Sequence, residues 1–217
     1  MTIQELYNQL FDRYGAQGWW PVHTGHHYRR SANPTARERR GYHPSDYSVP
    51  SGDPGRFEIC VGAILTQNTA WLNVERAIFN LIEAHAMSPD RMLAMGLEAL
   101  GELIRPSGYF NVKARKLQAY SEFHLSLDGR TPTREELLDV WGVGPETADN
   151  ILLYAYGVPV MVIDAYTRRI FAKFAIAEGD EDYEVLRALC ERELKGGVAV
   201  FQEFHALLVE HGKELNP

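Results

Sequence analysis

Apolar residues recur at helical spacing along most of the chain. Near the start, Ile3, Leu6 and Leu10 share one face with Tyr14, a pattern typical of an amphipathic helix. The same period predicts further helices over 57–65, 74–82, 97–104, 114–125, 145–156 and 165–174, with two more before the end of the chain. No persuasive alternating pattern occurs, and the apolar run 160–163 is better explained as a buried connector than as a strand. The sequence therefore predicts an all-α protein.

Composition narrows the class of protein. The 217 residues are 45% hydrophobic and 24% charged, as in soluble globular proteins. No apolar run approaches the roughly 20 residues that span a membrane, and the N-terminus lacks the blocks of a secretion signal, so we expect an intracellular protein with no membrane partner. Cys60 and Cys190 lie in apolar helical patterns, which favours buried thiols. No Cys/His spacing suggests zinc and two cysteines cannot hold a four-thiolate iron–sulfur cluster, so we expect no metal and no cofactor.

Charge is unevenly distributed. The net charge of −7 argues mildly against nucleic acid, but binding needs only one basic face. Five arginines lie at positions 29 to 40, inside an irregular, aromatic-rich stretch from 18 to 56, and five acids lie at 178 to 184. A loop as long as 18–56 is usually functional or partly disordered. Its basic part, 26–40, is either a phosphate-contacting segment or a solvated insertion.

The segment 133–156 reads as two helices joined by a tight turn. Thr133 and Glu136 form a capping box, and "VWGVGPETA" at 140–148 places two glycines before a proline suited to a first helical position. Exposed N–H groups at such a helix start bind anions, including DNA phosphates, although the turn alone is more typical of helices that only pack. The candidate phosphate-binding residues are Gly142, Val143, Gly144, Glu146 and Thr147.

A lone carboxylate follows the hairpin. Asp164 lies between the apolar run 160–163 and the next helix. An aspartate in this place is usually a helix N-cap, but one flanked by apolar residues is also partly desolvated, and such carboxylates are candidates for catalysis.

Hairpin and aspartate together resemble the helix-hairpin-helix, Gly/Pro-Asp superfamily of DNA glycosylases, in its endonuclease III group. The matching stretches are "LLDVWGVGPETADNILLYA", "VIDAYTRRI", "AILTQNT" at 63–69 and "RPSGYFNVKARKL" at 105–117. The resemblance implies two all-α lobes with DNA and active site at the cleft between them. One lobe would be 57–155, and the other would combine 1–56 with 156–217.

The resemblance also implies residue roles. Such enzymes flip the damaged nucleotide out of the duplex, and Gln67 and Tyr109 would fill the gap left in the stack. Asp164 would stabilise positive charge on the sugar and help activate water. The implied partner is double-stranded DNA with a damaged base, bound by a monomer in the nucleoid.

Two departures from the group carry information. Bifunctional members place a strand-cutting lysine where this chain has Glu146, and a carboxylate cannot form a Schiff base. We therefore expect a monofunctional glycosylase without AP-lyase activity. The four-cysteine cluster loop of most relatives would begin near Pro217, so we expect a cluster-free member.

Aromatic residues suggest the substrate. "GWWPV" beside "TQNT" and Trp71 is similar to the 3-methyladenine DNA glycosylase III branch, in which aromatic faces hold the flipped base. Trp20 and Trp71 would be the walls of the base pocket, with Trp19 and Pro21 beside them. Cationic alkylated purines stack strongly on such rings, so an alkylpurine such as 3-methyladenine is the expected substrate.

Other interpretations of the sequence remain open. The chain could instead be a mismatch uracil or thymine glycosylase, although no clear hydrogen-bonding residues for a pyrimidine edge stand out. It could also be a non-catalytic DNA-binding module that uses the hairpin alone, or a helical interaction protein. The role of Asp164 discriminates between them.

Overall fold

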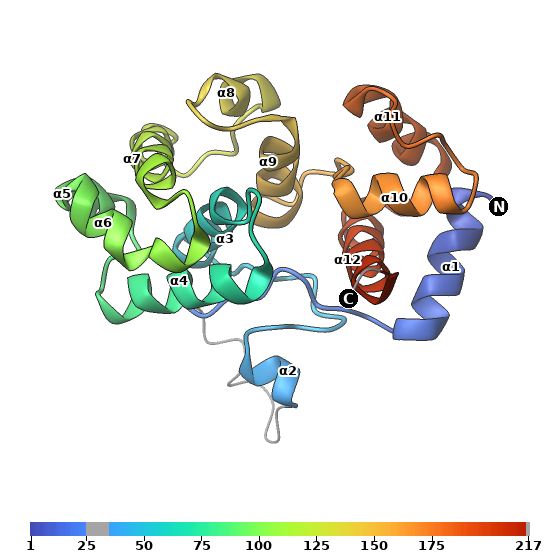
Figure 1. Ribbon diagram of the computed structural model, residues 1–217, viewed down its shortest axis with the longest axis horizontal. Helices are drawn as coiled ribbons and strands as arrows, with labels where there is room; N and C mark the ends of the chain where they lie inside the picture. The colour runs from blue at the N-terminus through green and yellow to red at the C-terminus, as the bar shows by residue number, and fades with distance from the viewer. Residues whose placement is uncertain (25–34, 216–217) are drawn as a thin grey trace. The chain divides into compact units, whose positions relative to one another are not determined.

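The structure is a computed structural model that describes residues 1–24 and 35–215. Within these ranges it contains helices and no strand, so the all-α class is confirmed (Figure 1). The helices are α1 (Ile3–Tyr14), α2 (Ala36–Arg39), α3 (Asp53–Leu65), α4 (Trp71–Glu83), α5 (Pro89–Ala94), α6 (Leu97–Leu103), α7 (Phe110–Ser126), α8 (Arg134–Asp139), α9 (Pro145–Asn150), α10 (Ala165–Lys173), α11 (Tyr183–Glu193) and α12 (Gly197–Leu215), with a 3-10 turn η2 (Arg105–Ser107) and a π-helical turn η3 (Ile151–Ala155).

Most helix boundaries follow from local chemistry. The capping box of Thr133 and Glu136 is confirmed at the start of α8. Helix α3 begins at Asp53, four residues before the expected start, because Pro54 occupies a first-turn position where its missing N–H costs nothing. The short helix α5 was not expected, although Ser88 caps it. The run 160–163 is a buried connector without strand pairing, as expected.

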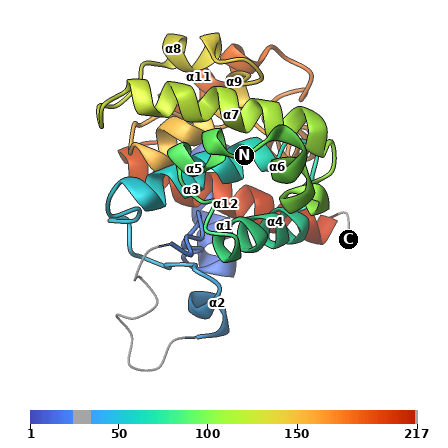
Figure 2. The ribbon, with the colours of Figure 1, turned by 90° about the vertical axis from the view of Figure 1, so that its left-hand side faces the viewer.

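The described chain divides into two compact units. Unit 1 comprises 1–21, 27–49 and 152–217, and unit 2 comprises 22–26 and 50–151. In unit 2 the long helix α7 packs against α3, α5 and α6 (Figure 2). Phe57 of α3 stacks on Tyr120 of α7, with ring centroids 6.4 Å apart, and both side chains are buried. Burial of these apolar faces stabilises the unit.

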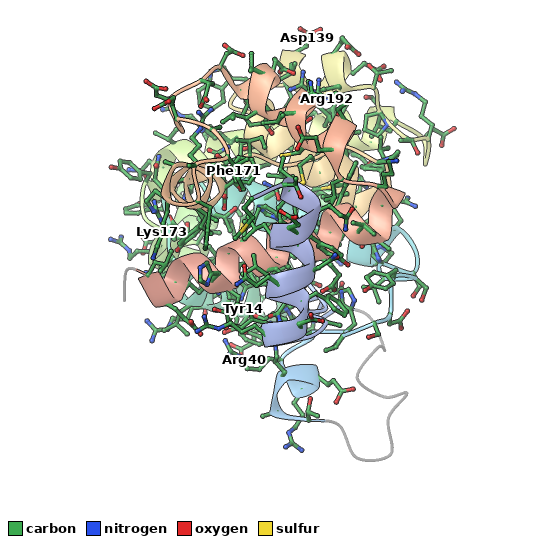
Figure 3. All side chains as sticks on the ribbon, turned by 90° about the vertical axis from the view of Figure 1, so that its right-hand side faces the viewer. Tyr14, Arg40, Asp139, Phe171, Lys173 and Arg192 are labelled. Atoms are coloured by element: carbon green, nitrogen blue, oxygen red, sulfur yellow. The ribbon has the colours of Figure 1, made fainter. Side chains whose placement is uncertain are left out.

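Unit 1 is built around α12, which α1 and α10 contact. Phe171 of α10 lies in its interior beside Phe204 of α12, with ring centroids 6.4 Å apart, while Lys173 is exposed on the same helix (Figure 3). Cys190 is buried in this unit and Cys60 in unit 2, both as free thiols, as expected. Burial raises the pKa of the Cys60 thiol to about 12, which makes it unreactive at neutral pH.

The basic segment 26–40 is only partly described. Arg29 and Arg30 lie outside the described residues. Arg37, in α2, donates to the side-chain oxygen of Gln17 at 2.8 Å and lies over the ring of Tyr42, so its guanidinium is held within unit 1. No helix among residues 1–24 and 35–215 has the length and apolar character needed to cross a membrane.

Candidate active site and DNA-binding hairpin

Asp164 is the N-cap of α10 and sits at the end of the buried connector. Its Oδ1 accepts hydrogen bonds from the Thr167 N–H at 2.7 Å and from the Thr167 hydroxyl at 2.8 Å. Its other oxygen, Oδ2, lies 3.6 Å from Nε2 of His205, and the carboxylate is 12% exposed. Burial alone would raise the pKa of Asp164, but His205 and the Thr167 donors outweigh it and lower that pKa. Asp164 is thus both a helix N-cap and a desolvated carboxylate, and it is ionised at neutral pH.

A chain of polar contacts continues from Asp164 into unit 1. Nδ1 of His205 lies 2.7 Å from the hydroxyl of Tyr154, which also donates to the Gln202 carbonyl at 3.1 Å. Burial, together with the nearby acids Glu203 and Asp164, raises the pKa of Tyr154 well above its ordinary value, so the phenol stays protonated. Tyr154 therefore holds the His205 imidazole through Nδ1, and this orients Nε2 toward Asp164.

Trp20 joins the same cluster. Its ring centroid lies 5.5 Å from that of Tyr154 and 5.4 Å from that of Trp19, and Trp20 is 3% exposed. The Trp20 carbonyl accepts from Nε2 of His43 at 2.8 Å, and Pro21 is buried directly after it. The structure thus connects Trp20 to Asp164 through Tyr154 and His205. Trp71 is half-buried at the first position of α4 in unit 2.

The hairpin of α8 and α9 is locked by a buried ion pair. Nε and Nη2 of Arg134 donate to the two oxygens of Asp149 at 2.7 and 3.2 Å, and the Asp149 side chain is fully buried. Bidentate pairing of this kind fixes geometry as well as charge. The two helices of the hairpin are therefore held in register from inside unit 2.

The two glycines of the turn differ in conformation. Gly142 has a φ of +87°, as expected for a glycine at a tight turn, but Gly144 has a φ of −102° and acts as the N-cap of α9. The Val143 N–H donates to the Val140 carbonyl at 3.0 Å, and its side chain is buried. At the start of α9, Gly144, Pro145 and Glu146 are exposed, whereas Thr147 is buried. Trp141, directly before Gly142, is 55% exposed.

Gln67 follows α3 and is bonded to the hairpin. Its Nε2 donates to the Gly142 carbonyl and to the Thr147 hydroxyl, each at 3.0 Å, while its Oε1 accepts from Nζ of Lys116. Both ends of the amide are thus used in the absence of DNA. The structure brings Gln67 and the phosphate-binding candidates together in unit 2.

A buried lysine holds the loop of Gln67 against the loop of Tyr109. Nζ of Lys113 donates to the Leu65 carbonyl at 2.7 Å, and to the Thr69 hydroxyl and the Ser107 carbonyl at 2.8 Å each. Burial, and then the charge of Lys116, lower the pKa of Lys113 to about 8. Tyr109 is the N-cap of α7, lies in the left-handed region with φ +46°, and is 72% exposed. The loops that carry Gln67 and Tyr109 therefore share one anchor.

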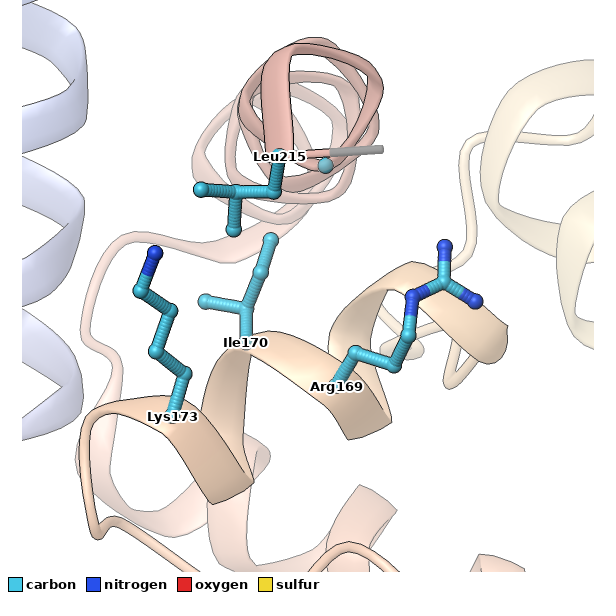
Figure 4. Close-up of a pocket in the computed structure, with 5 residues that line it drawn as sticks. Arg169, Ile170, Lys173 and Leu215 are labelled. Atoms are coloured by element: carbon cyan, nitrogen blue, oxygen red, sulfur yellow. The ribbon is translucent and has the colours of Figure 1, made fainter. Parts of the chain in front are cut away.

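A shallow pocket of about 200 Å³ opens between α10 and α12 in unit 1. Arg169, Ile170, Lys173, Gly212 and Leu215 line it, and Ile170 points toward Leu215 (Figure 4). Its volume is below the range usual for ligand sites. Asp164, His205 and Trp20 do not line this pocket, so it is separate from the carboxylate cluster.

The described residues offer no evident metal site. Residues 1–24 and 35–215 contain no cluster of three or more His, Cys, Asp or Glu side chains arranged to hold a metal ion. A four-thiolate iron–sulfur cluster does not fit these 217 residues either, because they include two cysteines, each buried in a different unit.

Sequence reasoning missed four residues of these clusters: Tyr154, His205, Lys113 and Lys116. His205 lies 41 positions after Asp164 on an apolar helix, and nothing local distinguishes it from a histidine that only packs. The two lysines offered a weak signal. They stand three residues apart on α7, so they share one side of that helix, but their partners come from distant parts of the chain.

Comparison with known proteins places these clusters in a family. Residues 61–195 match the HhH-GPD superfamily of base excision DNA repair proteins. A Methanocaldococcus jannaschii protein that carries the provisional name DNA repair glycosylase is 36% identical over 98% of this chain and 87% of its own length. Endonuclease III of Thermotoga maritima is 27% identical over 73% of this chain and 74% of its own.

Solved structures agree on the fold. The Helicobacter pylori 3-methyladenine DNA glycosylase, bound to 1,N6-ethenoadenine, superposes with a TM-score of 0.72 at 24% identity over the whole of both chains. A thermostable thymine-DNA glycosylase superposes with a TM-score of 0.63 at 21% identity over 75% of each chain. At these identities the likeness concerns the fold alone, and the family follows from the sequence match. The chain therefore belongs to the HhH-GPD superfamily of base excision DNA repair proteins.

Proposed function

We propose that this protein is a monofunctional DNA glycosylase that flips a damaged base out of double-stranded DNA and hydrolyses its N-glycosidic bond. The observation that carries the proposal is the setting of Asp164. A largely buried carboxylate, kept ionised by Thr167 and by the His205 imidazole, lies in a member of a base excision repair superfamily.

The carboxylate suits the chemistry of the step. As the bond between base and sugar breaks, positive charge develops on the sugar, and a fixed, desolvated carboxylate stabilises that charge more than a solvated one would. The same carboxylate orients and deprotonates the attacking water. The proposed outcome is a released base and an intact abasic strand.

Strand cutting is not part of the proposal, because an acid occupies the position of the strand-cutting lysine. Glu146 is exposed in the first turn of α9, and Nζ of Lys113 is buried and bonded to three acceptors. Borohydride reduction during reaction with an abasic or damaged duplex tests this directly. We expect no covalent protein–DNA adduct, and an adduct mapped to any lysine would contradict monofunctional chemistry.

For the substrate we propose an alkylated purine of the 3-methyladenine type. Support comes from the ring cluster of Trp19, Trp20 and Tyr154 next to His205 and Asp164, with Trp71 as the proposed second wall. Electron-rich rings favour a cationic base by stacking and need few hydrogen bonds. The H. pylori neighbour, a 3-methyladenine DNA glycosylase, agrees with this class.

Gln67, Tyr109 and the hairpin are proposed to contact the DNA. Tyr109, at 72% exposure, is available for insertion, and Gly144 and Glu146 are exposed at the start of α9. The test is a panel of duplexes that each carry one damaged base, scored for base release with and without alkali. Release of methylpurines, with strand breaks only after alkali, is the expected result. Release of uracil or thymine alone would show that the substrate is a pyrimidine. Binding without release of any base would show that the chain is a non-catalytic DNA-binding module.

A further inference from the structure

The turn of the hairpin is expected to meet a phosphate, yet the charged side chains at this turn are acidic. The segment 139–147 contains Asp139 and Glu146 and no lysine or arginine, and both acids are exposed. At neutral pH these carboxylates repel a phosphodiester and oppose the attraction of the backbone amides. A cation from elsewhere in the fold would offset this repulsion.

Lys116 of α7 reaches the hairpin. Its methylene stem lies across the turn, because a Cβ added to Gly142 would come within 2.5, 2.6 and 2.7 Å of Cγ, Cδ and Cε of Lys116. The absence of a side chain at Gly142 therefore makes room for the lysine. The ammonium group then ends at Oε1 of Gln67, whose Nε2 is bonded to the Gly142 carbonyl and the Thr147 hydroxyl.

The ammonium group retains capacity for a ligand. It carries three N–H donors, and one of them is used by Gln67. Among residues 1–24 and 35–215 no carboxylate pairs with it. Lys116 is half-buried, so its charge is less screened than that of a fully solvated lysine. Lys113, one turn away, differs on each point, since all its contacts are internal.

We propose that Lys116 supplies the positive charge with which the hairpin binds a DNA phosphate, and that Gln67 and the bare Gly142 turn hold its ammonium group in place. The proposal rests on the DNA-binding part of the proposed function. It gives the chain a cation at the hairpin that residue 146 does not provide, and it places that cation on a different helix.

The salt dependence of binding tests this. Each phosphate neutralised by a cation contributes about 0.9 to the slope of log K against log salt on B-DNA. Lys116→Met keeps the apolar stem over Gly142 and removes the charge, so we expect its slope to be smaller by about 1. We expect its affinity for undamaged and damaged duplexes to fall by about the same factor, roughly tenfold at low salt. Lys116→Arg should keep the slope, and fluorescence anisotropy with a labelled duplex measures all three proteins.

A matched control separates charge at the hairpin from charge in general. Arg91 is exposed on α5 of the same unit, away from α8 and α9, and Arg91→Gln should leave the slope unchanged. A slope for Lys116→Met equal to that of the wild type would overturn the proposal. So would an Lys116→Met protein that loses thermal stability but not slope, because Lys116 would then be a structural support for Gln67.

A single neutral methylphosphonate locates the contact. Placed at successive positions around a fixed abasic analogue, it should weaken wild-type binding at one phosphate and leave Lys116→Met insensitive there. Equal weakening in both proteins at every position contradicts the assignment. These outcomes are independent of catalysis: a protein that binds DNA and releases no base defeats the proposed glycosylase activity, while the slope still decides the role of Lys116.

Discussion

The cluster around Asp164 and the cluster around Gln67 are built in opposite ways. In unit 1, His205 and Tyr154 are buried, the Asp164 carboxylate is 12% exposed, and the three side chains contact one another. The Tyr154 hydroxyl also donates to the backbone carbonyl of Gln202. In unit 2 Gln67 is half-exposed, and its partners are a lysine and the turn that is proposed to meet DNA. A group that stabilises charge works best in fixed surroundings. Groups that bind a polyanion need donors that their internal contacts leave available.

The largest expected effect tests the cluster around Asp164. Asn at 164 retains the N-cap bonds to Thr167 but carries no charge, so Asp164→Asn should lower single-turnover base release by about 10³-fold, or about 4 kcal/mol. Duplex binding, followed by anisotropy, should stay within about twofold of the wild type, since the hairpin is untouched. His205→Gln should show a smaller loss of release. Base release by Asp164→Asn at the wild-type rate would remove this residue from the chemistry.

The next effect tests the ion pair that holds together the hairpin to which Gln67 is bonded. Arg134→Met leaves the Asp149 carboxylate buried without its bidentate partner, and breaking such a pair costs about 3 kcal/mol of unfolding free energy. Urea unfolding followed by circular dichroism measures it. Arg130→Met removes an exposed pair with Glu136 on the same hairpin and should cost far less. Similar losses in the two variants would mean that the hairpin is not locked from inside.

The smallest effect concerns Lys113, which anchors the loops that carry Gln67 and Tyr109. The pKa of Lys113 is lowered from 10.5 to about 8, so between these values the folded chain binds fewer protons than the unfolded chain. The penalty for the buried charge is thus present below pH 8 and is relieved as pH rises toward 10.5. The wild type should gain stability relative to Lys113→Met over this range, on the order of 2 kcal/mol. Parallel pH profiles of urea unfolding for the two proteins would show that Lys113 is not buried as a cation.

The two clusters differ in how much of each could be predicted from the sequence. The helices, the capping box at Thr133 and the position of Asp164 before α10 depend on spacing within a few residues, so periodicity and capping rules predicted them. Asp164 was expected either as an N-cap or as a desolvated carboxylate, and it is both. No rule based on neighbouring positions predicts the contact between His205 and Asp164, because this contact depends on the packing of α12 against α10.

The hairpin shows the same limit from another side. Its glycines and proline predicted a tight turn, and Gly142 has the positive φ that the turn requires. Gly144 does not, since it adopts an N-cap conformation open to other residues. The lysine that crosses the turn comes from α7, 26 positions before Gly142. A pattern of apolar positions predicts which face of α7 is buried but not which of its polar side chains reaches another helix.

The position of Trp141 has a practical consequence. Of the four tryptophans in the sequence, it is the one whose ring is mostly in solvent, and it precedes the glycine that Lys116 crosses. The other three, at 19, 20 and 71, are buried or half-buried and contribute a shielded, blue-shifted background. The chain thus carries its own fluorophore at the hairpin, and the red edge of its emission reports occupancy of that turn without a label on protein or nucleic acid.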